Sequence, residues 1–188
     1  TMVGTKFYNT QPPVEDATTV ERLRSAGALM VGKTNMHEIG LGVTGLNTHY
    51  GTTRNPYHLD HYPGGSSSGS AAAVAAGLCP IALGLDGGGS IRIPASLCGV
   101  VGLKTTWGRI SSAGSAPLSW SLSTVGPITS TVRDTALAYS FLAGPDPRQV
   151  WTQDQPSVDL QDFDNSDLTG VRLGVFLPWF NHASVDIV

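Results

Sequence analysis

Glycine is unevenly distributed along this chain of 188 residues, because 11 of its 23 glycines fall between positions 64 and 108. The first dense block, GGSSSGS at 64–70, leads directly into AAAVAA at 71–76. Small residues of this kind favour a closely packed helix, so a helix is predicted over 70–76, with the serines at its N-terminus. A flexible glycine–serine linker is the alternative interpretation, and the helix-forming run that follows argues against it.

A second block, DGGGSIR at 86–92, follows the apolar run 81–85, which is predicted to be a buried strand. Consecutive glycines allow several backbone N–H groups to point toward one position, which is how an oxyanion hole is built. A serine at that position could attack a carbonyl carbon whose oxygen those N–H groups hold. From the residues alone, a turn that ends a strand and carries a capping serine is an equally good interpretation.

The rest of the chain alternates between helical and strand patterns. Helices are predicted over 16–26, with Asp16 as the N-cap, and from 129–132 to 142, and short strands are predicted at 28–31 and 171–176. Glycine and proline break residues 32–65 into a loop, and the aspartate-rich residues 145–170 are predicted to be an exposed connection. The alternation predicts an α/β architecture with helices on both faces of a largely buried sheet. The last strand lacks a partner, so we expect further chain to follow it.

Two short matches to nucleotide-binding motifs are misleading. GALMVGKT at 27–34 fits the phosphate-loop pattern, but a helix precedes it and a broken loop follows, which inverts the order that phosphate binding needs. GLGVTG at 40–45 fits the dinucleotide pattern, but Gly51 and Pro56 leave no room for the helix that must open at its third glycine. Nucleotide binding through Lys33 is therefore the function ranked last.

Charge and cysteine content argue against several other functions. The formal net charge is −3 and no dense Lys/Arg cluster is present, which disfavours nucleic acid or an anionic membrane as the main partner. No apolar run approaches the ~18 residues of a membrane span. Cys79 and Cys98 are too few for a disulfide framework and lack the neighbouring ligands of a zinc site, so no metal and no cofactor are expected. These features predict a globular, cytoplasmic chain.

A serine nucleophile needs a base, and the residues alone leave its identity open. Asp86 or Asp134 could orient an imidazole, and five histidines are available: His37, His49, His58, His61 and His182. None of them has a sequence context that assigns it. The sharp-turn esterase signature G-x-S-x-G does not fit, because Arg92 stands in its last position.

Taken together, the motifs make the chain recognisable over nearly its whole length. They are GKTNMHE at 32–38, YGTTRNP at 50–56, the block 64–73, residues 83–94 and CGVVGLK at 98–104, with weaker matches at 126–127 and Asp134. In these residues the chain resembles the amidase signature family, and within it the plant-type fatty acid amide hydrolases most. The resemblance implies a mixed sheet flanked by helices on both faces. It implies a partial core at 1–144, the exposed connection at 145–170 and the truncated start of the next strand segment at 171–188.

The resemblance also implies a Ser–cis-Ser–Lys mechanism of amide hydrolysis. By match to the family motif, Ser90 is the acylated nucleophile, and Ser66, on a cis peptide bond, relays its proton to a neutral lysine. The backbone N–H groups that hold the oxyanion belong to Ser90 itself and to three glycines before it, and Gly40 offers a carbonyl near the lysine. The residues with supporting roles are Gly87, Gly88, Gly89 and Gly40 around the substrate, and Ser67, Asp86 and Arg92, which keep the loop in shape.

The sequence departs from the family pattern in one respect that matters for the chemistry, because the relay lysine is missing. Lys6, Lys33 and Lys104 are the lysines present, and none matches the Val-Lys-Asp-like segment that carries the base in relatives. Leu85 and Gly87 are smaller departures, at positions where relatives carry a small hydroxyl residue and Thr or Ile respectively. The chain is therefore interpreted as the central piece of an amidase that holds the nucleophile and the oxyanion hole but not the base.

Three other functions stay open at this point. In order, they are a non-catalytic remnant or binding subunit of the same fold, a serine hydrolase with a histidine base, and the nucleotide binder. The predicted partners are a small-molecule amide, with fatty acid amides following from the resemblance only, and either a second copy or a complementing chain. The expected location is the cytoplasm, with peripheral membrane association of the full-length protein left open.

Overall fold

The computed structural model describes residues 2–8, 11–116 and 118–181. Its helices are α1 (Thr18–Ser25), α2 (Ser68–Ala75), α3 (Arg92–Leu97), α4 (Val132–Leu142) and α5 (Leu177–Phe180), with the 3-10 turns η1 (Glu38–Gly40) and η2 (Val150–Thr152). Its strands are β1 (Ile81–Asp86), β2 (Val101–Gly102) and β3 (Thr124–Thr129). The predicted helices that became α1, α2 and α4 and the predicted strand that became β1 are confirmed to within the usual uncertainty of element ends.

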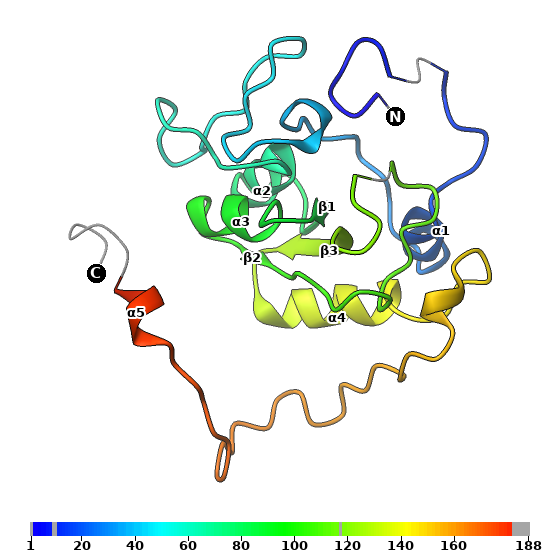
Figure 1. The fold of residues 1–188 in the computed structure, drawn as a ribbon, viewed down its shortest axis with the longest axis vertical. Helices are drawn as coiled ribbons and strands as arrows, with labels where there is room; N and C mark the ends of the chain where they lie inside the picture. Colours follow the sequence, from blue (N-terminus) through cyan, green and yellow to red (C-terminus); the bar gives the residue numbers. More distant parts are fainter. Residues whose placement is uncertain (1, 9–10, 117, 182–188) are drawn as a thin grey trace.

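The three strands form one sheet in the order β1-β3-β2, and both neighbouring pairs are antiparallel. Figure 1 shows α2 and α3 on one side of this sheet and α4 on the other, with α1 packed next to α4. The predicted α/β architecture with helices on both faces is thus confirmed. The strand pairs in the described part of the chain are antiparallel throughout, so they do not include the parallel component of a mixed sheet.

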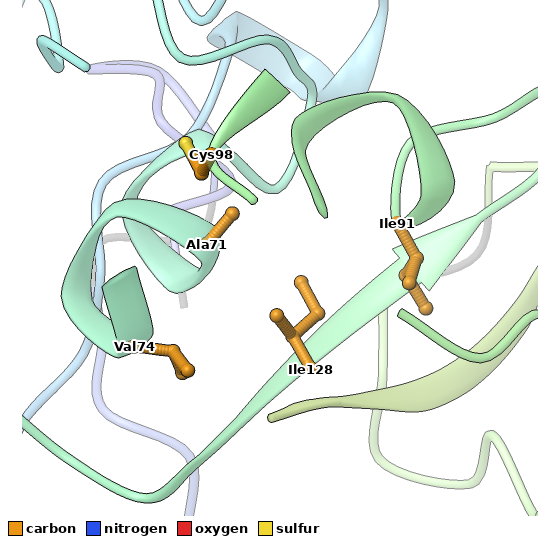
Figure 2. Packing of buried hydrophobic residues seen from close by; sticks show 5 residues of the cluster. All are labelled: Ala71, Val74, Ile91, Cys98 and Ile128. Carbon is orange, nitrogen blue, oxygen red and sulfur yellow. The ribbon is translucent and has the colours of Figure 1, made fainter. Parts of the chain in front are cut away.

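Each face of the sheet carries its own hydrophobic cluster. Figure 2 shows the first, in which buried side chains of α2 and β3 pack with two from the segment between them: Ala71, Val74, Ile91, Cys98 and Ile128. The second cluster lies toward α1 and α4 and contains Leu23, Ile110, Val125 and Leu142. Successive strand residues face opposite sides of a sheet, so β3 serves both clusters through Val125 and Ile128. A fully buried Val, Leu or Ile side chain contributes about 1.5–3 kcal/mol.

Helix α2 approaches the sheet closely because its residues are small. A Cβ added to Gly69 would lie 2.6 Å from the backbone of Asn35, so no larger residue fits there without displacing the loop beneath. Ser70 Oγ donates a hydrogen bond to the carbonyl of Leu83 in β1 at 2.8 Å. The first glycine–serine block is therefore tied to β1 just before the second block begins.

No strand is predicted at 124–129 from the sequence, although β3 is the central strand of the sheet. Proline lacks an N–H group and is normally confined to edge strands, so Pro127 argues against a strand here. In the structure the carbonyl of Pro127 accepts from the N–H of Leu103 at 3.1 Å, just past the end of β2 at Gly102. The missing N–H therefore falls where the neighbouring strand has already ended.

The strand predicted at 28–31 is wrong, and the one predicted at 171–176 is not formed among the described residues. Both segments are irregular chain without a sheet partner among the described residues, and Leu29 and Leu173 are 88% and 85% exposed. A short apolar run becomes a strand only when a second segment supplies its hydrogen bonds, and the pattern does not say where that segment is. The predicted N-cap is also wrong, since Ala17 holds that position and the Asp16 carboxylate instead pairs with Arg24 at 3.3 Å.

The connection predicted over 145–170 is exposed along most of its length, but some of its polar residues near the start are buried. Asp146 and Gln149 are buried, and the Asp146 carboxylate accepts hydrogen bonds from Thr18 and, at 2.5 Å, from Ser111. Burial raises the pKa of Asp146, but hydrogen bonds from Ser111, Thr18 and Arg148 outweigh it and hold that pKa well below its usual value. The polar residues were predicted to be exposed, yet these hydroxyl groups replace water around the carboxylate. Figure 1 shows the later part of the segment running away from the body of the molecule.

The two nucleotide-type motifs lie in irregular chain. Residues 28–34 leave α1 as exposed chain without regular structure, and the 3-10 turn η1 is the next helical element. The strand–loop–helix order of a phosphate site is thus not formed there, as the sequence predicts. Within the part of the chain that the structure describes, no helix is long and apolar enough to cross a membrane.

Candidate active site

The two glycine–serine blocks come together at the end of β1. The backbone N–H of Ser67 donates to the carbonyl of Ser90 at 3.1 Å. The N–H of Leu85 donates in turn to Ser67 Oγ at 3.3 Å. These two contacts place the segment that opens α2 directly against the loop that follows β1, so the structure brings together the two regions that the sequence singles out.

Glycine is needed where these segments touch. A Cβ on Gly84 would lie 2.7 Å from Ser67 Oγ, and a Cβ on Gly65 would lie 2.8 Å from the backbone nitrogen of Gly45. Both distances are shorter than real Cβ atoms show, so a larger residue at either position would push the segments apart. The unusual glycine content of this region is thus explained by close backbone approach.

Ser66 is buried, at 4% exposure, and the Gly65–Ser66 peptide bond is cis. The carbonyl of Ser66 accepts a hydrogen bond from the N–H of His37 at 3.0 Å. A Cβ built on Gly40 would lie 3.8 Å from Ser66 Oγ, so Gly40 is a neighbour of this hydroxyl. Ser90 is partly exposed, whereas Ser66 and Ser67 are buried. The exposed member of the three is therefore the one that an incoming substrate can reach.

Asp86 holds the loop after β1 in place. Its carboxylate is fully buried and accepts three backbone hydrogen bonds, from Gly89 at 2.7 Å, Ile91 at 3.1 Å and Arg92 at 3.3 Å. The Arg92 guanidinium adds two bonds of 3.1 Å each. Burial alone would raise the pKa of Asp86, but these hydrogen bonds outweigh it and leave that pKa below its usual value. Asp86 is thus ionised, and its hydrogen bonds to backbone N–H groups fix the conformation of the glycine loop that follows β1.

The predicted oxyanion hole needs one correction. The N–H of Gly89 is bound to Asp86 Oδ1, so Gly89 is not free to donate to an oxyanion. Among the described residues, the N–H groups of Gly87, Gly88 and Ser90 have no hydrogen-bond acceptor. Gly89 contributes its backbone conformation instead, since its φ of +125° is one that residues with a side chain rarely adopt. Three backbone donors therefore remain beside Ser90.

A Ser–His–Asp arrangement is not found in the part of the chain that the structure covers, because no histidine ring there hydrogen-bonds to Ser66 or Ser90. His182 lies outside the described residues. The other four rings have different neighbours: that of His37 lies 3.5 Å from Thr44 Oγ1, that of His49 lies 2.7 Å from Glu38, and those of His58 and His61 stack. Asp134 lies in the first turn of α4, where Thr131 caps it.

A family model described as Amidase matches residues 1–186 of the chain. The chain belongs to the amidase family. Over 184 residues it is 51% identical to a fatty acid amide hydrolase of Medicago truncatula, an alignment that covers 95% of this chain and 30% of the relative. The amidase chain therefore spans less than a third of that relative's length.

Solved structures of amidases share this fold. A glutamyl-tRNA(Gln) amidotransferase subunit from Thermotoga maritima superposes with a TM-score of 0.82 at 42% identity, over 86% of this chain and 36% of that one. The native peptide amidase from Stenotrophomonas maltophilia superposes with a TM-score of 0.80 at 42% identity, over 86% of this chain and 34% of that one. The sequence identity and the superposition therefore agree, and the chain has the fold of the amidase family.

In this amidase chain, Lys104 has a role that the sequence motif did not assign. Its ammonium group donates to the backbone carbonyls of Asp86 and Leu122, and it lies 3.9 Å from Asp86 Oδ1. Burial lowers the pKa of Lys104, and the charge of Asp86 partly offsets that effect. Its place in the CGVVGLK motif was the only signal that the sequence offered. Lys6 and Lys33 are exposed.

Proposed function

We propose that this chain is the central part of a serine-dependent amide hydrolase, in which Ser90 is the acylated nucleophile and Ser66 relays its proton. The observation that carries the proposal is the contact between the two glycine–serine blocks. It ties a partly exposed Ser90 to the segment that holds Ser66. The N–H groups of Gly87, Gly88 and Ser90 itself have no acceptor within the described part of the chain. A reactive hydroxyl beside preorganised N–H donors is the arrangement that acyl transfer requires.

The proposed reaction begins when Ser90 Oγ attacks the amide carbonyl carbon. The Ser90 proton passes to Ser66, while Ser66 gives its own proton to a neutral lysine that another part of the protein supplies. The N–H groups of Gly87, Gly88 and Ser90 donate to the oxyanion that forms. When the C–N bond breaks, the proton returns through Ser66 to the leaving amine, and water then hydrolyses the acyl-Ser90 ester. Asp86, Arg92 and Ser67 hold this geometry without taking part in bond making.

The substrate that we propose is a small-molecule amide, and a fatty acid amide in particular. The support is the 51% identity to a relative that is named a fatty acid amide hydrolase. Another similar structure is named as one subunit of an amidotransferase, which supports a complementing chain or a second copy as the partner of this one. The corresponding location is the cytoplasm, with peripheral attachment to the membranes from which long-chain amides come.

The test is hydrolysis by the whole protein of three amides: oleamide, a short-chain primary amide and a C-terminally amidated peptide. We expect Ser90→Ala and Ser66→Ala each to lower kcat for the preferred amide by at least ~10². Single alanine variants should each keep most of the activity at every histidine of the chain, a result that would exclude a histidine base from this chain: His37, His49, His58, His61 and His182. Full activity in Ser66→Ala would contradict the relay. No hydrolysis of any amide by a folded wild-type protein would favour the non-catalytic remnant.

A further inference from the structure

Ser123 Oγ is a buried polar atom without a hydrogen-bond partner, and it is the one side-chain atom of this kind within the residues that the structure describes. Buried hydroxyl groups are nearly always paired, because leaving one unpaired costs about 1–3 kcal/mol. The backbone of Ser123 is well held, since its N–H donates to the carbonyl of Ser119 at 3.1 Å. The unpaired hydroxyl is therefore a specific feature of the side chain and calls for an explanation.

The register of the sheet places this hydroxyl against the oxyanion loop. Strands β1 and β3 pair antiparallel as far as Asp86 opposite Thr124, so the next position sets Gly87 opposite Ser123. A Cβ added to Gly87 would lie 3.0 Å from Ser123 Oγ, and no other non-neighbouring heavy atom of the described residues would come within 4 Å of it. Ser123 is thus the side chain that borders the first residue of the loop.

Lys104 fixes these two positions relative to each other. Its ammonium group donates to the carbonyls of Asp86 and Leu122, the residues just before Gly87 and Ser123. The carbonyl of Gly87 itself accepts no hydrogen bond from the described residues. An unpaired donor on Ser123 therefore lies beside Gly87, whose carbonyl shares a peptide unit with the Gly88 N–H. Neither group of that unit has a hydrogen-bond partner among the described residues.

We propose that Ser123 is a positioning residue for the oxyanion hole. Its hydroxyl donates to the carbonyl of Gly87 once substrate occupies the site, and this contact turns the N–H of Gly88, which belongs to the same planar peptide unit, toward the oxyanion. Hydrogen bonds that serve catalysis are often incomplete in the free enzyme and form in the substrate complex. The inference rests on the proposed function, because it assigns Ser123 to the same oxyanion hole. It goes further by naming a side chain that orients one backbone N–H donor of that hole.

The test compares Ser123→Ala with wild type and with Ser119→Ala in the whole protein, using the amide that wild type hydrolyses fastest. Ser119 is the matched control, because it lies one turn away and its side chain does not reach Gly87. Direct loss of one oxyanion donor lowers kcat by about 10²–10³. An indirect role predicts a smaller loss, about 5- to 30-fold in kcat, with KM unchanged. The midpoint of thermal unfolding should not fall, because the deleted hydroxyl had no partner to lose.

A merely structural role predicts the opposite pattern, with a lowered unfolding midpoint and an unchanged kcat, and that result would overturn the inference. A wild-type kcat in Ser123→Ala alongside active wild-type enzyme would overturn the inference alone. Inactive wild-type enzyme would overturn both this inference and the proposed function.

A second measurement is a double-mutant cycle that tests the close approach of Gly87 and Ser123. Gly87→Ala should lower kcat more strongly in the wild-type background than in Ser123→Ala, where the atom at 3.0 Å is gone. Simple additivity of the two losses would count against the contact.

Discussion

The guanidinium of Arg92 reaches both carboxylate oxygens of Asp86, with Nε 3.1 Å from Oδ2 and Nη2 3.1 Å from Oδ1. This bidentate pair is asymmetric in its environment, because the Asp86 side chain is fully buried while the Arg92 side chain is 54% exposed. The carboxylate also carries three backbone hydrogen bonds of the loop. Loss of the Asp86 carboxylate should therefore lower the stability of the fold much more than loss of the Arg92 guanidinium.

Asp86→Asn is expected to lower the free energy of unfolding by about 2–4 kcal/mol, because it leaves backbone donors and a guanidinium facing an amide. Arg92→Gln should cost no more than about 1 kcal/mol, since the guanidinium is largely in water. Urea denaturation of the whole protein measures both. Equal losses in the two variants would show that the ion pair, and not the backbone bonds to the carboxylate, determines stability.

The stability of the protein should depend on pH through Asp86 and Asp146, whose pKa values both lie below the usual range. A group with a lowered folded-state pKa stabilises the fold fully above its unfolded pKa of about 3.9, and that contribution is lost as the pH falls through the folded-state value. Urea midpoints should therefore decrease as the pH is lowered below about 4. Asp86→Asn should show a shallower decrease, and Asp154→Asn, at an exposed position, should follow wild type. An unchanged slope in Asp86→Asn would refute this assignment.

Gly84→Ala tests the contact between the two serine blocks. The added methyl would lie 2.7 Å from Ser67 Oγ and 2.8 Å from Ile91 Cγ1, so we expect a loss of about 1–3 kcal/mol in stability and a lowered kcat. Gly32→Ala is the control, because a Cβ there meets nothing within 4 Å. Circular dichroism melts and amide hydrolysis read out the two effects. A neutral Gly84→Ala would mean that the two segments are less closely packed than described.

Much of this site could be predicted from the sequence, but the roles of its residues came from the family resemblance, because the residues alone fitted a capped turn equally well. The segment at 64–70 opens a small-residue helix as predicted, and the glycines at 87–89 follow a strand as predicted. The role of Gly89 was predicted less well. A carboxylate three residues earlier competes for its N–H, and the pattern cannot show which acceptor wins.

The remaining errors share a physical cause. The apolar runs at 28–31 and 171–176 have strand composition, but strand formation depends on a partner segment that the local pattern does not contain. The central strand β3 was not predicted, and its Pro127 argues against a strand. The missing N–H of Pro127 costs a hydrogen bond only if β2 extends that far, and β2 ends before it. Asp146 was expected in water, and hydroxyl and guanidinium groups enclose it instead. Each of these outcomes is decided by contacts that the local sequence pattern does not contain.

The most direct test of the central claim is covalent labelling of the whole protein with a fluorophosphonate, followed by peptide mapping. We predict a single phosphonylated serine at Ser90, with labelling abolished in Ser90→Ala and slowed by ~10²–10⁴ in Ser66→Ala. Labelling should be slowed as much in the isolated 188-residue chain, because the proposed mechanism takes its lysine from another part of the protein. Labelling at another serine, or undiminished labelling of Ser90→Ala, would contradict the assignment of Ser90 as the nucleophile.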